Sequence, residues 1–145
     1  MTTPAPSALA PPDRAILRVL LVDDHEMFRR RLREFLEEVQ DIHVLAEAED
    51  GRAAVRLAGE LEPDAVVIDV AMPGLNGIEA TRLITASRPS VRVVALSMHG
   101  ERGFVDGMLA AGAAGYVLKE NAFSQLVRAL RVVTDGGTYL CDTLA

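Results

Sequence analysis

The sequence predicts an α/β protein built on a parallel sheet with helices on both of its faces. Short apolar runs rich in Val, Ile and Leu alternate five times with longer amphipathic segments. The runs are apolar at nearly every position, which is typical of strands buried on both faces. Because strand–helix units are joined by right-handed crossovers, they form a parallel sheet that helices cover on each side.

The bulk composition is that of one domain. The chain has 145 residues, half of them hydrophobic, which is enough for a core at this size. Its net charge of −6 argues against nonspecific binding to nucleic acid. The single cysteine, Cys141, cannot form an internal disulfide and fits a reducing compartment. No apolar run approaches membrane-spanning length, so we expect a cytoplasmic protein with no membrane partner.

Three strands are predicted in the first half of the chain, each followed by a helix. Residues 1–13 precede them with four prolines and no signal-peptide pattern, so we expect a disordered tail there. The first helix has an apolar stripe from Phe28 to Val39, the second starts at Gly51 with Asp50 as its cap, and the third stops at Pro89. The predicted strands are Ile16–Val22, the more polar and edge-like Ile42–Ala48, and Ala65–Asp69.

Two more strand–helix units follow. The segment Gly103–Ala114 should be helical, but Gly107 and Gly112 interrupt it at a cost of roughly 1 kcal/mol each relative to alanine. The last helix is predicted to have Asn121 as its cap and to end at Gly136–Gly137. The strands are Val91–Leu96 and Tyr116–Leu118. For these five strands we expect the doubly wound, flavodoxin-like order 2-1-3-4-5.

Polar residues gather where the predicted strands end. The first strand is followed by Asp23 and Asp24, the third ends in Asp69, the fourth is followed by Ser97, and the fifth ends in Lys119. In the expected order these strands are neighbours, and their C-terminal ends meet where open α/β sheets bind their ligands. Each residue alone has an ordinary structural explanation, such as a turn, a cap or a surface lysine. Their convergence on one edge favours a functional site.

The charges of this set indicate the chemistry. Three neighbouring carboxylates repel one another and raise each other's pKa values, and a hard dication such as Mg²⁺ relieves that repulsion. An ionised aspartate beside Mg²⁺ can attack phosphorus and form an aspartyl phosphate. Ser97 and Lys119 can hydrogen-bond and neutralise phosphoryl oxygens. No glycine-rich phosphate loop is present to hold a nucleotide, so the phosphoryl group must come from another donor.

Four motifs carry this pattern: L-L-V-D-D-H, V-V-I-D-V-A-M-P-G-L-N-G, A-L-S-M-H and A-G-Y-V-L-K. Together, from about Arg14 to Gly137, they resemble the receiver domain of a bacterial two-component response regulator. The stretch A-G-A-A-G-Y-V-L-K-E-N followed by L-V-R-A-L-R-V-V-T-D-G-G-T-Y-L resembles the subgroup with a LuxR-type helix-turn-helix output domain. The resemblance implies a receiver over 14–137, with 138–145 starting a linker to an output domain absent here.

The resemblance implies a role for each residue of the acidic set. Asp69 is the implied phosphoacceptor. Asp24 and Asp69 are the implied direct ligands of Mg²⁺, together with the backbone carbonyl of Ala71, while Asp23 reaches the ion through water. Ala71 also lies at a position that tunes the lifetime of the phosphoryl group in the family, and its small side chain leaves the attacking water open access.

The resemblance also assigns the switching residues. Ser97 has the implied Thr/Ser switch position, Lys119 the role of the family's lysine, and Tyr116 that of the aromatic residue that turns inward when the hydroxyl moves. Glu120 follows the lysine where many receivers have proline, which removes the usual reason to expect a cis peptide there. His99 lies at a second position that tunes the lifetime, although such a residue is more often simply part of a loop.

As a receiver, the chain would take a phosphoryl group from a sensor histidine kinase and act on DNA only through its output domain. It would be no enzyme beyond its own phosphorylation and dephosphorylation. The arginine run Arg29–Arg33 suits a solvated helix face or a kinase-docking edge equally. We expect phosphorylation to promote a homodimer through the helix at 103–111, the strand at Tyr116 or the helix at 123–133.

Two alternatives remain at this point. A phosphatase of the haloacid dehalogenase type also uses an aspartate at a strand end, but it needs a second acid two residues later, where this chain has Ala71. A pseudo-receiver is an interaction module that is never phosphorylated. Such modules usually lack one of the acids or the lysine, and this chain keeps all of them.

Overall fold

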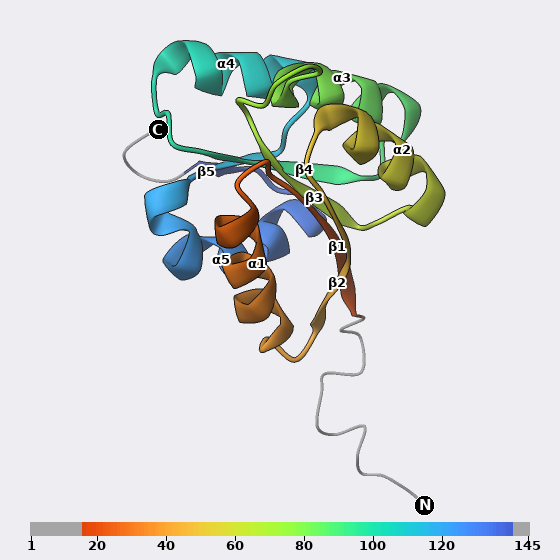
Figure 1. Cartoon of the computed structure of the whole chain (residues 1–145), viewed down its shortest axis with the longest axis vertical. Coiled ribbons are helices and arrows are strands. Elements are labelled where there is room, and N and C mark those ends of the chain that lie inside the picture. The colour runs from red at the N-terminus through yellow and green to blue at the C-terminus, as the bar shows by residue number, and fades with distance from the viewer. Residues whose placement is uncertain (1–15, 141–145) are drawn as a thin grey trace, which may run out of the picture.

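The computed structural model describes residues 16–140 and shows a parallel sheet between two layers of helices (Figure 1). The strands are β1 Leu17–Val22, β2 Ile42–Ala48, β3 Ala65–Asp69, β4 Arg92–Ser97, β5 Gly115–Leu118 and β6 Tyr139–Leu140. The helices are α1 Glu26–Glu37, α2 Gly51–Leu61, α3 Gly77–Ser87, α4 Arg102–Ala111, the 3-10 turn η2 Lys119–Asn121, and α5 Ala122–Thr134. The predicted tail at 1–13 and Cys141 lie outside the described residues.

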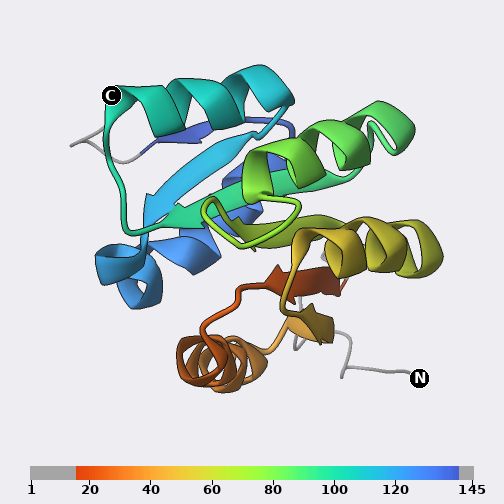
Figure 2. The same cartoon turned by 45° about the horizontal axis from the view of Figure 1, so that its top comes forward.

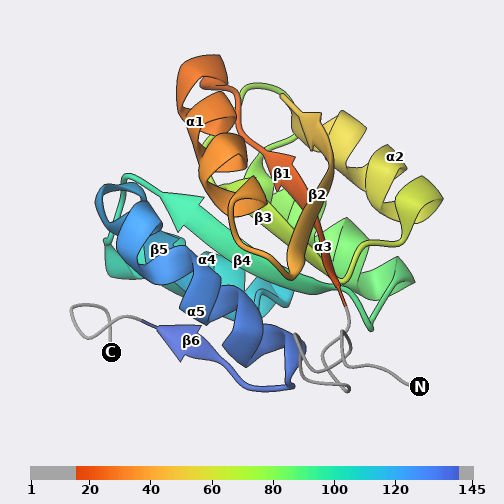
Figure 3. The same ribbon diagram turned by 90° about the horizontal axis from the view of Figure 1, so that it is seen from below.

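The sheet has the order β2-β1-β3-β4-β5-β6, with every neighbouring pair parallel. The predicted order of the first five strands and the edge position of the second are confirmed. The prediction of five strands is wrong, because β6 pairs beside β5 (Figure 3) and Tyr139 donates its N–H to Ala114 at 2.9 Å. Two residues are too few for an alternating pattern, so β6 left no strand signal in the sequence.

Two apolar clusters hold the layers together, one on each face of the sheet. Successive strand residues point to opposite faces. In β1, Val19 and Leu21 therefore pack with α1 and α5, whereas Leu20 and Val22 pack with α2, α3 and α4. Figure 2 shows the second group of helices side by side over the sheet. No helix within residues 16–140 is long and apolar enough to cross a membrane.

One helix end and one helix cap differ from the sequence prediction. The helix expected at Gly103–Ala114 ends at Ala111, because Gly112 adopts a left-handed φ of 112° and terminates it. Asn121 precedes α5, but its side chain accepts no capping hydrogen bond. Asp50, by contrast, caps α2 as predicted by accepting the N–H of Ala53 at 2.8 Å.

Some arginines of the run in α1 form ion pairs with β2, and others are exposed to solvent. Arg29 and Arg33 bind the Glu47 carboxylate on β2 at 2.7 and 2.8 Å. Burial alone would raise the pKa of Glu47, but hydrogen bonds from these two guanidinium groups outweigh it and lower that pKa. Arg29 also donates to the backbone carbonyl of Asp23, so α1 is tied to the end of β1. Arg31 is exposed.

Candidate functional site: an acidic pocket at the strand ends

The predicted acids and the lysine meet at the C-terminal edge of the sheet. β1 and β3 are adjacent, with Val22 paired to Ile68, so the residues that follow them lie side by side. Asp23 and Asp69 are both buried, while the Asp24 side chain is 30% exposed at the rim. The order of strands thus brings the three carboxylates together, as the sequence predicted.

Lys119 is the only lysine in the chain, and its ammonium group binds the two buried acids. Its Nζ lies 2.8 Å from Asp23 Oδ2 and 3.3 Å from Asp69 Oδ2. The lysine side chain is 9% exposed and each carboxylate 5%. The contact with Asp23 is an ion pair without hydrogen-bond alignment, and Asp23 Oδ2 accepts no hydrogen bond from the described residues.

Burial raises the pKa of the Asp69 carboxyl because it disfavours the charged form. Lys119 opposes that effect by its positive charge and a hydrogen bond, and the neighbouring Asp23 adds to it by repulsion. The net direction is upward. Lys119 is therefore the main group that favours the ionised form of the buried Asp69 carboxyl.

The backbone around Asp69 is held tightly. Oδ1 of Asp69 accepts the N–H of Ala71 at 3.3 Å, and Gly77 at the start of α3 donates its N–H to Val70 at 2.9 Å. A Cβ atom on Gly77 would lie 2.1 Å from the carbonyl oxygen of Asp69. Only glycine permits α3 to begin this close to the end of β3. The Ala71 carbonyl, predicted as a metal ligand, remains a prediction.

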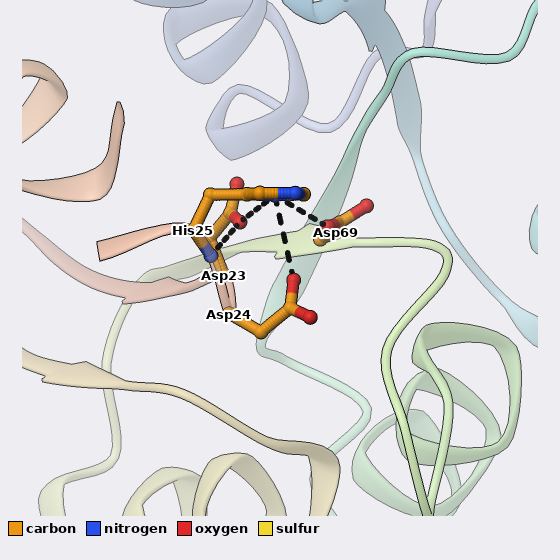
Figure 4. Close-up of side chains that lie close together, drawn as sticks. All are labelled: Asp23, Asp24, His25 and Asp69. Atoms are coloured by element: carbon orange, nitrogen blue, oxygen red, sulfur yellow. Dashed lines mark hydrogen bonds and ion pairs between the residues drawn. The ribbon is translucent and has the colours of Figure 1, made fainter. Parts of the chain in front are cut away.

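His25 also reaches into the pocket, a contact that the sequence analysis did not anticipate (Figure 4). Its Nδ1 lies 3.1 Å from Asp23 Oδ1, 3.4 Å from Asp24 Oδ1 and 3.8 Å from Asp69 Oδ2. The same nitrogen is 3.0 Å from Lys119 Nζ. The backbone N–H of His25 donates to Asp23 Oδ1 at 2.8 Å, which ties the start of α1 to the acid.

The pocket fits a divalent cation. One ligand atom from each of Asp23, Asp24, His25 and Asp69 lies within 4.8 Å of the others. Carboxylate oxygens are the ligands that Mg²⁺ prefers, and the three carboxylates have one ammonium group, that of Lys119, beside them, so a dication would neutralise the remaining negative charge. The residues present therefore suit a metal site.

The predicted switch residues lie beside the pocket, around the loop after β4. Ser97 is fully buried, and its Oγ accepts the N–H of His99 at 2.9 Å. The Tyr116 hydroxyl, also buried, donates to the carbonyl of His99 at 2.6 Å. The His99 ring stacks on Phe104 of α4 with the centroids 4.7 Å apart. One loop residue thus contacts both switch residues and the following helix.

The other end of α4 is fixed to α3. The Thr85 hydroxyl donates to the carbonyl of Ala111 at 2.8 Å. A Cβ at Gly112 would lie 2.6 Å from that hydroxyl oxygen, so α3 packs closely against the glycine that ends α4. The C-terminal end of α4 is therefore held by a hydrogen bond, whereas its N-terminal end contacts the loop through the aromatic stack.

The fold is that of a receiver domain, and a comparison with known families agrees. The family described as "Response regulator receiver domain" matches residues 19–131. The chain belongs to this family.

Its similarity to particular proteins is also clear. The chain is 38% identical over 130 residues to the response regulator GacA of Pseudomonas viridiflava and 39% identical over 130 residues to UvrY of Escherichia coli K12. Each match covers 90% of this chain but only 61% and 60% of the relative. The chain therefore spans about three fifths of the length of these relatives.

Solved structures lead to the same class. A LuxR-family response regulator from Aurantimonas sp. SI85-9A1 superposes with a TM-score of 0.85 at 36% identity, covering 90% of this chain and 93% of the other. The signal receiver domain of NarL from Mycobacterium tuberculosis gives a TM-score of 0.80 at 32% identity, covering 84% and 98%. The chain is thus a LuxR-type receiver in sequence and in fold.

Proposed function

We propose that Asp69 accepts a phosphoryl group in the presence of Mg²⁺. The observation that carries this proposal is the position of its carboxylate at the end of a buried strand, 3.3 Å from the only lysine and beside two further acids. In the transfer, a carboxylate oxygen of Asp69 bonds to phosphorus. The donor's bond to phosphorus breaks, and its electron pair leaves with the donor.

The other residues have separate roles in this proposal. Lys119 opposes the effect of burial on the pKa of Asp69, and so favours the ionised carboxylate that attacks. Asp23, Asp24 and Asp69 would hold the cation, with the carbonyl of Ala71 completing the set. When bound, Mg²⁺ supplies charge neutralisation for the transferring phosphoryl oxygens. Ser97 Oγ would leave the N–H of His99 to donate a hydrogen bond to the phosphorylated Asp69.

The donor and the output follow from the family. Response regulators of this kind act with histidine kinases, and we infer a phosphohistidine as the donor to this chain. On the same basis we propose that the protein regulates transcription through a DNA-binding output domain. We also propose a phosphorylation-dependent homodimer and a cytoplasmic location. The transcriptional regulatory protein DegU of Brevibacillus brevis, 38% identical over 124 residues, supports an output in transcription.

The test is phosphorylation by acetyl phosphate with Mg²⁺, followed by intact mass and peptide mapping. We expect one phosphoryl group on the peptide that contains Asp69, and none on an Asp69→Asn variant, which keeps the shape and removes the nucleophile. Asp64→Asn is the matched control, because Asp64 precedes β3 at the end opposite to Asp69, where its carboxylate accepts the N–H of Arg18. A phosphorylated Asp69→Asn protein would refute the assignment, and an unmodified parent protein would favour the pseudo-receiver.

A further inference from the structure

His25 adds a nitrogen donor to a pocket whose other donors are oxygens. The ring belongs to the residue just before α1, and its Nδ1 faces all three carboxylates (Figure 4). Half of the side chain is open to solvent, at 57% exposure, so an ion can approach the ring without unfolding the site. The proposed phosphotransfer uses the oxygens alone and assigns no role to this nitrogen.

The separations between the donors fit a small tetrahedral ion. With metal–ligand bonds of about 2.0–2.1 Å, two ligand atoms of a tetrahedral Zn²⁺ site lie about 3.4 Å apart. The three distances from His25 Nδ1 to the carboxylate oxygens are 3.1, 3.4 and 3.8 Å, which bracket that value. The separations from the ring nitrogen therefore suit an N₁O₃ site, and the donor atoms of the four residues all lie within 4.8 Å of one another.

A second observation points to a cation at the same place. Asp23 is nine-tenths buried in the pocket, and its Oδ2 accepts no hydrogen bond from the described residues. Lys119 Nζ lies 2.8 Å from this atom and also contacts Asp69 Oδ2 and His25 Nδ1, so one ammonium serves several acceptors. Three carboxylates beside a single ammonium leave negative charge that a dication would neutralise.

We propose that this pocket also binds a borderline transition dication of the Zn²⁺ type, with His25 Nδ1 as its fourth ligand. Imidazole suits Zn²⁺, Ni²⁺ and Cu²⁺, whereas Mg²⁺ prefers oxygen ligands and keeps several waters. Zn²⁺ would bond to His25 and to one oxygen of each carboxylate. Mg²⁺ would use the carboxylates and water, and the ring would not be its ligand. The two ions thus compete for Asp23, Asp24 and Asp69.

This inference concerns the metal site of the proposed function and has a consequence for it. A tetrahedral ion held by all four side chains has no open position for a phosphoryl oxygen, whereas Mg²⁺ keeps waters that a phosphoryl group can replace. Zn²⁺ should therefore displace Mg²⁺ without replacing it in phosphorylation. Phosphorylation of Asp69 would then depend on which of the two ions occupies the pocket.

The test compares binding of ZnCl₂ and MgCl₂ by calorimetry in the whole chain and in two variants. His25→Ala should weaken Zn²⁺ binding by at least about tenfold, the scale on which even outer-shell partners of a metal affect its affinity. It should change Mg²⁺ binding by less than about threefold, since Mg²⁺ keeps water in place of nitrogen ligands. His43→Ala removes an exposed histidine on β2 and should change neither affinity.

Co²⁺ gives a readout that reports the ligand directly. Its visible absorption depends on the donor atoms, so the spectrum of the parent should change in His25→Ala and persist in His43→Ala. Equal Zn²⁺ affinity of parent and His25→Ala would overturn the proposal. Parallel loss of Zn²⁺ and Mg²⁺ in His25→Ala would also overturn it, because that result would make His25 a structural residue.

The outcome is independent of the proposed phosphorylation. If parent and His25→Ala differ in Zn²⁺ affinity while acetyl phosphate never modifies Asp69, the metal proposal stands and the phosphoacceptor assignment fails. If Asp69 is phosphorylated with Mg²⁺ while parent and His25→Ala bind Zn²⁺ equally, the phosphoacceptor assignment stands and the metal proposal fails.

Discussion

Replacing Lys119 by methionine should destabilise the metal-free protein strongly at neutral pH. The substitution leaves the buried carboxylates of Asp23 and Asp69 without their ammonium partner, at contacts of 2.8 and 3.3 Å. At an effective dielectric of about 20, each contact corresponds to roughly 5–6 kcal/mol of attraction before desolvation is subtracted. Removing one partner of a buried ion pair costs about 3–5 kcal/mol, and we expect a loss of this size.

The loss should depend on pH. Burial already raises the pKa of Asp69, and the variant lacks the charge that opposes this effect. A carboxyl whose folded pKa lies above its unfolded value stabilises the fold when protonated, and this stabilisation fades as pH rises through the folded pKa. The difference in unfolding free energy between parent and Lys119→Met should therefore be widest at neutral pH and narrow as the pH falls through the raised folded pKa.

Urea unfolding in EDTA, at neutral and mildly acidic pH, measures both effects. Arg128→Met removes an exposed cation from α5 and should change the unfolding free energy by less than about 0.5 kcal/mol. Excess Mg²⁺ should restore part of the stability of Lys119→Met, because a dication replaces the missing positive charge. A loss below about 1 kcal/mol, or an equal loss at both pH values, would refute the reasoning.

Five further substitutions test the fold by urea unfolding. Gly77→Ala should lower the unfolding free energy by more than about 3 kcal/mol, because the added Cβ would meet backbone atoms. Gly103→Ala, whose Cβ would meet open space, should raise it by about 0.5–1 kcal/mol. Equal effects of the two substitutions would contradict this description of the packing. Asp50→Ala should cost about 1 kcal/mol and Asn121→Ala less, unless both residues cap. Glu47→Gln should destabilise at neutral pH, and the difference should vanish as pH falls through the lowered folded pKa; a difference that persists in acid would exclude the ion pairs as its cause.

The fold and most of the pocket could be predicted because strand ends are visible in the sequence. Asp69 ends an apolar run, and parallel strands bring their C-terminal ends to one edge, so its neighbours Asp23 and Lys119 followed from strand order alone. The family comparison confirms the receiver class. The roles of the individual residues stay predictions.

The parts that were missed depend on side-chain direction or on very short segments. His25 follows two aspartates in a loop, and no periodic pattern determines which way its ring turns. The strand at Tyr139 has two residues and depends on a partner strand. Gly112 could equally interrupt a helix or end one, and its close contact with Thr85 decides between them. Tertiary contacts determine these three features, and such contacts are not visible in the sequence of a single protein.

The unequal attachment of α4 has a geometric consequence for signalling. The helix is fixed at its C-terminal end by the hydrogen bond from Thr85 to Ala111, and its ten residues span about 15 Å. A tilt of about 10° around that end would displace the opposite end, which carries Phe104, by roughly 2.6 Å. Because the His99 ring stacks on Phe104 near that end, a shift of the loop at His99 moves the N-terminal end of α4 by a similar distance while the end at Ala111 stays in place.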